Sequence, residues 1–238
     1  MPAFVQSVAG GNNGSTAQSL GYTSANTATN LLVAVMRIPT STSLSTITDS
    51  AGNTWLTAAG AGNTNVTGGT QHRVWWVPNA IGNTNTVTAH IGDVGTNRIG
   101  LAIAEFSGCT TGTPLDNVVN STGGSSQVLT ATVTTAESSE ALVCAGTKGN
   151  IEIPSTENGF DNLIFNDNGR VHFCNRMVTA TASTYLGQVG FSSGLNGSAT
   201  NAWGAVFLTF RSTNVAAGGA LLSPSGFLPL IGVQMYDF

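Results

Sequence analysis

Short apolar runs alternate with clusters of Gly, Asn, Asp, Ser and Thr along the chain, and apolar residues almost nowhere recur at helical spacing. The runs are rich in Val, Ile, Thr and aromatic residues, which are typical of strands. The expected strands are Ala3–Ala9, Leu31–Ile38, Leu44–Thr48, Thr54–Ala59, His72–Pro78, Asn85–Ile91, Arg98–Ser107, Gln127–Thr134, Ala141–Thr147, Asn162–Asn166, Val171–Ala180, Thr184–Phe191 and Ala202–Arg211. Many short strands separated by turn residues predict a sandwich or a barrel.

Two strand patterns favour the sandwich. Leu31–Ile38 and Ala202–Phe210 are apolar on both faces, as expected of central strands between packed sheets. Gln127–Thr134 alternates Thr with apolar residues, as expected of a strand with one solvent-facing side. We therefore predict an all-β fold, a jelly-roll-like antiparallel β-sandwich over residues 1–212, followed by an extended apolar C-terminal tail.

Two clusters of turn residues predict hairpins. Asp49–Asn53 separates Leu44–Thr48 from Trp55 and Leu56, and Asn166–Gly169 separates two further strands with an Asn-Gly step. No segment recurs at a constant period, so we expect no internal repeat.

The last segment, residues 213–238, differs from the rest of the chain. A linker of small residues precedes a strongly apolar end that carries two prolines and no charge before Asp237. This end is too short and too interrupted to span a membrane, and left in water it would be a sticky patch. It therefore forms either a last strand of the sandwich or an arm that docks on another subunit. The docking side chains of the second alternative are Leu221, Leu222, Phe227, Leu228, Leu230, Ile231, Met235, Tyr236 and Phe238.

Composition restricts the partners. Only 8% of the residues are charged, the net charge is -4, and the seven Lys and Arg residues are scattered, so we expect no nucleic-acid partner. The first residues carry neither a basic nor an apolar signal region, so we expect a protein made without secretion.

Candidate chemistry is sparse. His72, His90 and His172 lack the spacing of metal ligands, and the chain has no nucleophile elbow or phosphate-binding loop, so we expect no metal, no cofactor and no catalytic residue. The three cysteines, Cys109, Cys144 and Cys174, lie far apart in the sequence. We expect buried reduced thiols, with one disulfide as the alternative.

Glu105 stands out because it shares an apolar strand face with Leu101. A buried carboxylate needs a partner. We expect a structural ion pair across the sheet with Arg37, Arg73 or Arg98.

Trp75 and Trp76 are adjacent on a predicted strand, so their side chains point to opposite faces. We expect one to be buried and the other partly exposed. The exposed indole is a candidate for stacking on a sugar ring or for an interface contact.

Three stretches together resemble a loosely defined group of β-sandwich proteins found in tailed-phage virions and among bacterial extracellular proteins. They are Ile47–Trp55, Val74–Ala80 followed by Asn85–Thr88, and Ala104–Gly108 followed by Pro114–Asp116. The resemblance covers residues 1–212, consists of turn and core residues, and implies the fold more than an activity. The absence of a secretion signal favours the phage side of this group.

The resulting expectation is a non-enzymatic virion structural protein on the virion surface, either a decoration or a cement protein of the capsid. Its partners would be further copies of itself, with a trimer as the natural guess, and virion proteins such as the major capsid protein. The alternative is a glycan-binding adhesin or tail-associated receptor-binding module, in which Trp75 or Trp76 contacts a host surface glycan beside the loops Gly60–Gly69 and Gly108–Asp116. A glycan-degrading enzyme would require a carboxylate pair that the sequence does not identify.

Overall fold

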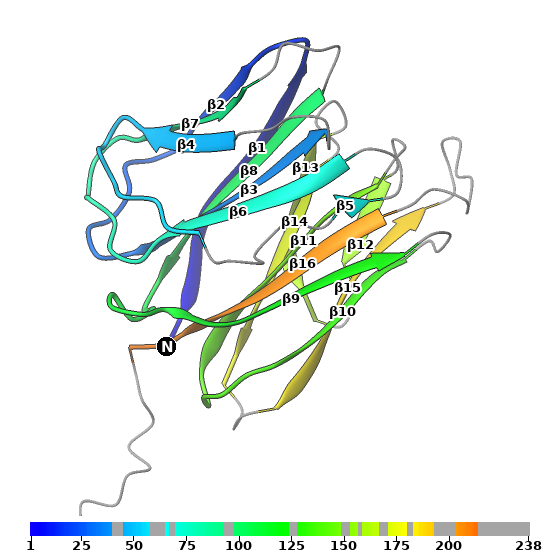
Figure 1. The fold of residues 1–238 in the computed structure, drawn as a ribbon. Helices are drawn as coiled ribbons and strands as arrows, with labels where there is room; N and C mark the ends of the chain where they lie inside the picture. Colours follow the sequence, from blue (N-terminus) through cyan, green and yellow to red (C-terminus); the bar gives the residue numbers. More distant parts are fainter. Residues whose placement is uncertain are drawn as a thin grey trace, which may run out of the picture.

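The computed structural model describes residues 1–39, 45–57, 65–66, 70–92, 98–123, 128–148, 153–156, 159–166, 171–179, 183–192 and 203–213. The regular elements of this part are strands (Figure 1). They are β1 (Ala3–Asn13), β2 (Ala17–Gly21), β3 (Leu31–Pro39), β4 (Ser45–Asp49), β5 (Asn65–Val66), β6 (Thr70–Val77), β7 (Thr86–Ile91), β8 (Arg98–Ser107), β9 (Leu115–Gly123), β10 (Val128–Thr134), β11 (Glu140–Lys148), β12 (Ile153–Thr156), β13 (Asp161–Asn166), β14 (Val171–Val178), β15 (Thr184–Ser192) and β16 (Trp203–Arg211). Among the described residues, no helix is long and apolar enough to cross a membrane.

The strands form four antiparallel sheets that stack as four layers (Figure 1). The two central layers have the orders β1-β8-β3-β6-β5 and β13-β14-β11-β16-β9, and the outer layers are β2-β7-β4 and β10-β15-β12. The central core contains Phe106, Phe173 and Phe210, while Trp75 and Phe207 lie in the two outer cores. The predicted all-β antiparallel sandwich is thus confirmed.

The eight strands of the first half recur in the second half. Adding eight to each strand number converts β1-β8-β3-β6-β5 into β9-β16-β11-β14-β13 and β2-β7-β4 into β10-β15-β12, which are the observed orders. Each half is an eight-stranded, jelly-roll-like sandwich. Contacts between the halves are reciprocal as well. The contact of β1 with β13 has its counterpart in the contact of β9 with β5, and the contact of β8 with β14 has its counterpart in that of β16 with β6. The halves therefore pack like the two subunits of a symmetric dimer.

Register and irregularities also match between the halves. One residue bulges from β1 (Val5) and one from the corresponding place in β9 (Asp116). The bond from the Tyr22 backbone N–H to the carbonyl of Asn85 (3.1 Å) recurs from Thr135 to Ser183 (3.0 Å). Further matched pairs, read from the strand registers, are Gln6 and Asn117, Asn30 and Glu140, Trp75 and Cys174, and Glu105 and Thr209.

The expectation of no internal repeat is therefore wrong at the level of structure. Loops of different length separate the matched strands, so the interval between matched residues changes from Gln6–Asn117 to Thr86–Thr184. A search for a constant period misses such a repeat.

Twelve of the thirteen predicted strands are present, with ends shifted by a few residues. Thr54–Ala59 is the exception, because its described residues contribute only a single bridge from Leu56 to Trp76. The predicted hairpin after Asp49 is also wrong, since β4 pairs with β7. The hairpin at Asn166 is supported by the antiparallel pairing of β13 with β14, although its turn lies outside the described residues.

Four strands, β2, β5, β9 and β12, were not expected. β9 contains Asp116 and Asn117, which resemble turn residues in the sequence, but the bulge at Asp116 lets β9 pair along β16.

Candidate functional site

Glu105 is fully buried and forms the centre of a polar site in the first half, which we call the first carboxylate hub. Its Oε1 accepts hydrogen bonds from the Thr27 backbone N–H (2.8 Å) and the Asn30 side chain (2.7 Å). Its Oε2 accepts from the side chains of Gln6 (2.6 Å) and Asn26 (2.9 Å). Four donors offset the desolvation of the carboxylate without a cation.

The expected ion pair of Glu105 with an arginine is therefore wrong, and the strand geometry explains why. Arg37 follows the alternation that places its side chain toward the central core, whereas Glu105 faces the β2-β7-β4 layer. Arg73 pairs with Met36, four residues along β3 from Leu32, which pairs with Glu105. At about 3.3 Å per residue, Arg73 therefore lies roughly 13 Å from Glu105 along the strand direction.

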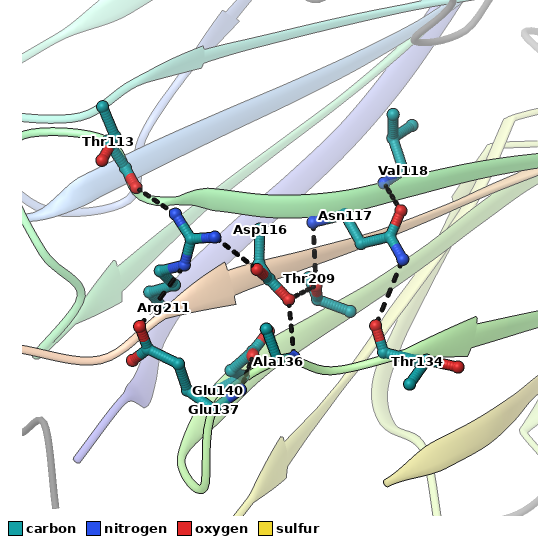
Figure 2. Close-up of polar contacts among 10 residues, drawn as sticks. All are labelled: Thr113, Asp116, Asn117, Val118, Thr134, Ala136, Glu137, Glu140, Thr209 and Arg211. Carbon is teal, nitrogen blue, oxygen red and sulfur yellow. Dashed lines mark hydrogen bonds and ion pairs between the residues drawn. The ribbon is translucent and has the colours of Figure 1, made fainter. Parts of the chain in front are cut away.

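The second half contains a corresponding hub with its carboxylate on another strand (Figure 2). Thr209 occupies the place of Glu105, and Glu140 occupies that of Asn30. The Oε1 of the buried Glu140 accepts from the Glu137 backbone N–H (3.0 Å), which matches Thr27. In both hubs a carboxylate thus accepts a hydrogen bond from a backbone N–H that lies shortly before a central strand, β3 in the first half and β11 in the second.

The second hub satisfies its carboxylate less completely. Glu140 Oε2 is buried without a hydrogen-bond donor in this structure. Burial raises the pKa of Glu140, contacts with the Glu137 backbone and the Thr209 hydroxyl lower it, and the neighbouring Asp116 raises it further. A protonated Glu140 can supply the missing hydrogen bond itself, so the site favours holding a proton.

Arg211 forms ion pairs with two further carboxylates at this end of the sheet, Asp116 and Glu137 (Figure 2). Its guanidinium lies 2.5 Å from Asp116 Oδ1 and 3.4 Å from Glu137 Oε1. The other oxygen of Asp116 accepts from the Ala136 backbone N–H (2.8 Å) and lies 3.5 Å from the donating hydroxyl of Thr209. The bulge at Asp116 turns its side chain into this network.

Two carboxyl groups that lie close together, one of them with a raised pKa, are an arrangement that can transfer protons. Here, however, Glu140 is fully enclosed, and the corresponding site of the first half is built from structural hydrogen bonds. Within the described part, no group of three His, Cys, Asp or Glu side chains could hold a metal ion. We therefore assign both hubs a structural role.

Asp49 forms a third hub, at the loop end of the first half. Its carboxylate accepts from the Asn53 backbone (2.9 Å) and side chain (2.7 Å), from the Trp55 indole N–H (3.1 Å) and from the Asn85 side chain (3.1 Å). These bonds close the turn that contains Gly52, whose φ of 78° suits glycine. The conspicuous Asp49–Trp55 stretch is thus a loop clamp.

Trp75 and Trp76 point to opposite faces of β6, as expected, but both are buried, with 7% and 6% of their surfaces exposed. The expectation that one is exposed is wrong, because an outer layer covers Trp75 and the second half covers Trp76. Trp76 still borders a mainly apolar pocket of about 220 Å³. The other lining residues are Leu56, Gly112, Thr113, Pro114 and Leu115.

The three cysteines are free and buried, as expected. Burial raises the pKa of Cys109 to about 12. Cys144 and Cys174 face each other across β11 and β14, with the Cys174 thiol 3.6 Å from the Cys144 carbonyl oxygen. The hydrogen bond to Cys144 and burial both raise the pKa of Cys174, so neither effect favours a reactive thiolate.

The nine predicted docking residues between Leu221 and Phe238 lie outside the described residues, as does most of the Gly60–Gly69 loop. The described chain ends at Thr213, whose backbone N–H donates to the carbonyl of Gly108 (2.9 Å).

The fold and its three hubs define a double-sandwich protein whose hydrogen-bonded carboxylates fix loops and strand ends. No protein-family model matches the chain, and no curated protein matches it in sequence.

Proposed function

We propose that the protein is a non-enzymatic structural protein of a phage virion, displayed on the capsid surface as a decoration or cement protein. Residues Leu221–Phe238 dock on a neighbouring subunit or on the major capsid protein, and the double sandwich faces outward. A homo-oligomer, with three copies as the working number, fits such display.

The observation that carries this proposal is that the last described residues, Arg211–Thr213, are fixed to the sandwich by several hydrogen bonds and ion pairs. The Arg211 carbonyl accepts from the Thr110 backbone (3.0 Å), and the Ser212 N–H donates to Ser139 (3.2 Å). Thr213 is bonded to Gly108, and the Arg211 side chain is held by Asp116 and Glu137. An arm that transmits a load between subunits requires such a fixed base.

The use of the carboxylates supports the non-enzymatic part of the proposal. Glu105 and Asp49 are each surrounded by hydrogen-bond donors from several segments, so their charge holds loops in place. A particle surface needs this rigidity, because virion proteins must stay folded outside the cell.

Light scattering on the full chain and on a chain that ends at Thr213 tests the assembly part. We expect a defined oligomer for the full chain and a folded monomer for the shortened one. Two equally folded monomers would contradict the docking role of residues 214–238.

Mass spectrometry of purified phage particles tests the virion part. Peptides of the full chain should be found in the particles, and a phage that encodes the shortened chain should lose them. Particles that lack the full chain would contradict the virion location.

The second candidate function is a glycan-binding module. The buried Trp75 and Trp76 do not support it, but the loops at one end of the first half do, as argued below.

A further inference from the structure

The second half provides an internal control for the loops of the first half. The β2–β3 connection is Tyr22–Asn30 in the first half, whereas Thr135–Ser139 suffices for the corresponding β10–β11 connection. Likewise, Pro78–Asn85 joins β6 to β7 in the first half, whereas the shorter Thr179–Ser183 joins β14 to β15 in the second. The same fold closes with shorter loops, so the additional residues of the first half are not required by the fold.

The longer loops are bonded to one another and to the Asp49 turn. Backbone bonds join Asn26 to Asn83 (2.8 Å) and join Ala80 to both Asn30 (2.9 Å) and Thr29 (3.0 Å). The Ile81 backbone N–H donates to the Asn53 side chain (2.8 Å). We call residues 22–30, 50–55 and 78–85 the loop platform.

Two further features show that the loop platform is held in one conformation. Thr29 has a φ of 72°, which is unusual for a β-branched residue and persists only where its surroundings impose it. A Cβ at Gly82 would lie 2.9 Å from the backbone nitrogen of Ala28, so the two loops touch at backbone distance. A surface fixed in this way loses little conformational entropy when it binds a partner.

The chemistry of the loop platform is neutral and hydrogen-bonding. Residues 22–30, 50–55 and 78–85 contain no Asp, Glu, Lys, Arg or His. The nearby carboxylates of the buried Glu105 and the partly buried Asp49 accept hydrogen bonds from platform residues. The exposed polar side chains are short hydroxyls and amides, and they include Thr23, Ser24, Thr27, Thr29, Asn79, Asn83 and Thr84.

Apolar area is present but small. Within the platform, Ile81 is 49% exposed and Trp55 is half-buried. Protein interfaces usually depend on Trp, Tyr or Arg anchors that insert into the partner, and Trp55 is held in place by its bond to Asp49. A sugar offers many hydroxyls and small C–H faces, which match this mixture of short polar groups and a few apolar contacts.

We propose that the loop platform is a preorganised binding surface for a neutral glycan. This inference does not depend on the location of the protein on a virion. Short hydroxyl and amide side chains hydrogen-bond the sugar hydroxyls, and Ile81 and Trp55 contact its C–H faces.

The test uses the full chain on an array of neutral oligosaccharides, followed by calorimetric titration with the best-bound sugar. Ile81→Asp and Thr27→Arg place a charge on the platform at exposed positions. Leu186→Asp, at a residue 44% exposed, and Thr132→Arg, at another exposed position, make the same changes on the second half.

We expect the full chain to retain at least one neutral glycan, and the platform variants to bind it at least tenfold more weakly. The two control variants should bind within twofold of the original chain, and all four should unfold at similar temperatures. Failure to retain any glycan, an equal loss in the control variants, or capture of a protein instead of a glycan would overturn the inference. Because the solution mass is measured separately, failure here is distinguishable from failure of the virion proposal.

Discussion

The same chemical change should have opposite effects at the two carboxylate hubs. Glu105→Gln replaces one oxygen of the first hub by an NH₂ group, which then faces the donors that Oε2 now accepts. Two charge-assisted hydrogen bonds are lost, each worth about 1.5–3 kcal/mol. The Asn26 amide can turn its unbonded Oδ1 toward the new NH₂ and recover part of this loss. We expect the free energy of unfolding to fall by about 3–5 kcal/mol.

Glu140→Gln should instead stabilise the protein at neutral pH. The new side chain still accepts from the Glu137 N–H, and its NH₂, which replaces the Oε2 that has no donor, can donate to the neighbouring Asp116. The pKa of Glu140 is raised in the folded state, so its protonation favours folding below about pH 4.5, and this benefit disappears as pH rises through the folded pKa. We expect a gain of about 1–2 kcal/mol at pH 7 and a smaller one at pH 4.

Urea unfolding followed by tryptophan fluorescence at pH 7 and pH 4 measures both effects, with the slope against urea concentration as a check on two-state behaviour. Circular dichroism should show the same strand content in each variant. A change of the same sign at both positions would refute the claim that the hubs differ in hydrogen-bond satisfaction. An effect of Glu140→Gln that does not vary with pH would refute the raised pKa of Glu140.

Three further predictions concern other buried or strained groups. Burial, and to a smaller extent Arg37, lower the pKa of His72 to about 4, so its contribution to stability is complete above about pH 6.5 and is lost as pH falls to 4. His72→Leu should therefore remove about 3 kcal/mol of the stability difference between pH 7 and pH 4, and a difference that persists unchanged would contradict this. Thr29→Asn should raise the free energy of unfolding by about 1 kcal/mol in urea titrations, because Asn tolerates a positive φ, whereas the control Thr27→Asn should change it little. Cys109 should react with a maleimide at pH 7 only after unfolding, and modification of the folded protein detected by mass spectrometry would show that its burial is transient.

The strands could be predicted from the sequence because their residues alternate or cluster according to burial. Leu31–Ile38 and Ala205–Phe210 lie in central strands, and their apolar side chains are fully buried, as the two-sided apolar pattern of these segments predicts. β9 was missed because Asp116 and Asn117 look like turn residues, and their role depends on contacts with Arg211 and Thr209 across the sheet. Local patterns do not reveal such long-range partners.

The carboxylate sites were only half predictable. The apolar neighbours of Glu105 correctly indicated burial, but its donors, Gln6, Asn26 and Asn30, are ordinary amides in a chain rich in such residues. A carboxylate on an apolar face suggests an arginine by default, and here a loop rich in Asn supplies the donors instead. Glu140 gave no sign of its role, since its equivalence to Asn30 becomes visible only once the registers of both halves are compared.

If the loop platform binds a glycan, as we propose, the two halves separate a structural task from a recognition task within one fold. Each half must close the same end of its sandwich and offset one buried carboxylate there, and the second half does so with Thr135–Ser139 and with Glu140, whose pKa burial raises. The first half uses a longer loop whose amides saturate Glu105, and Thr29 in the same loop has a positive φ of 72°. Loop length, donor number and backbone strain therefore change together, on the same side of the molecule. If rigidity were needed only for the fold, the shorter closure would serve in both halves. The additional order of the loop platform is better explained by a partner that binds it.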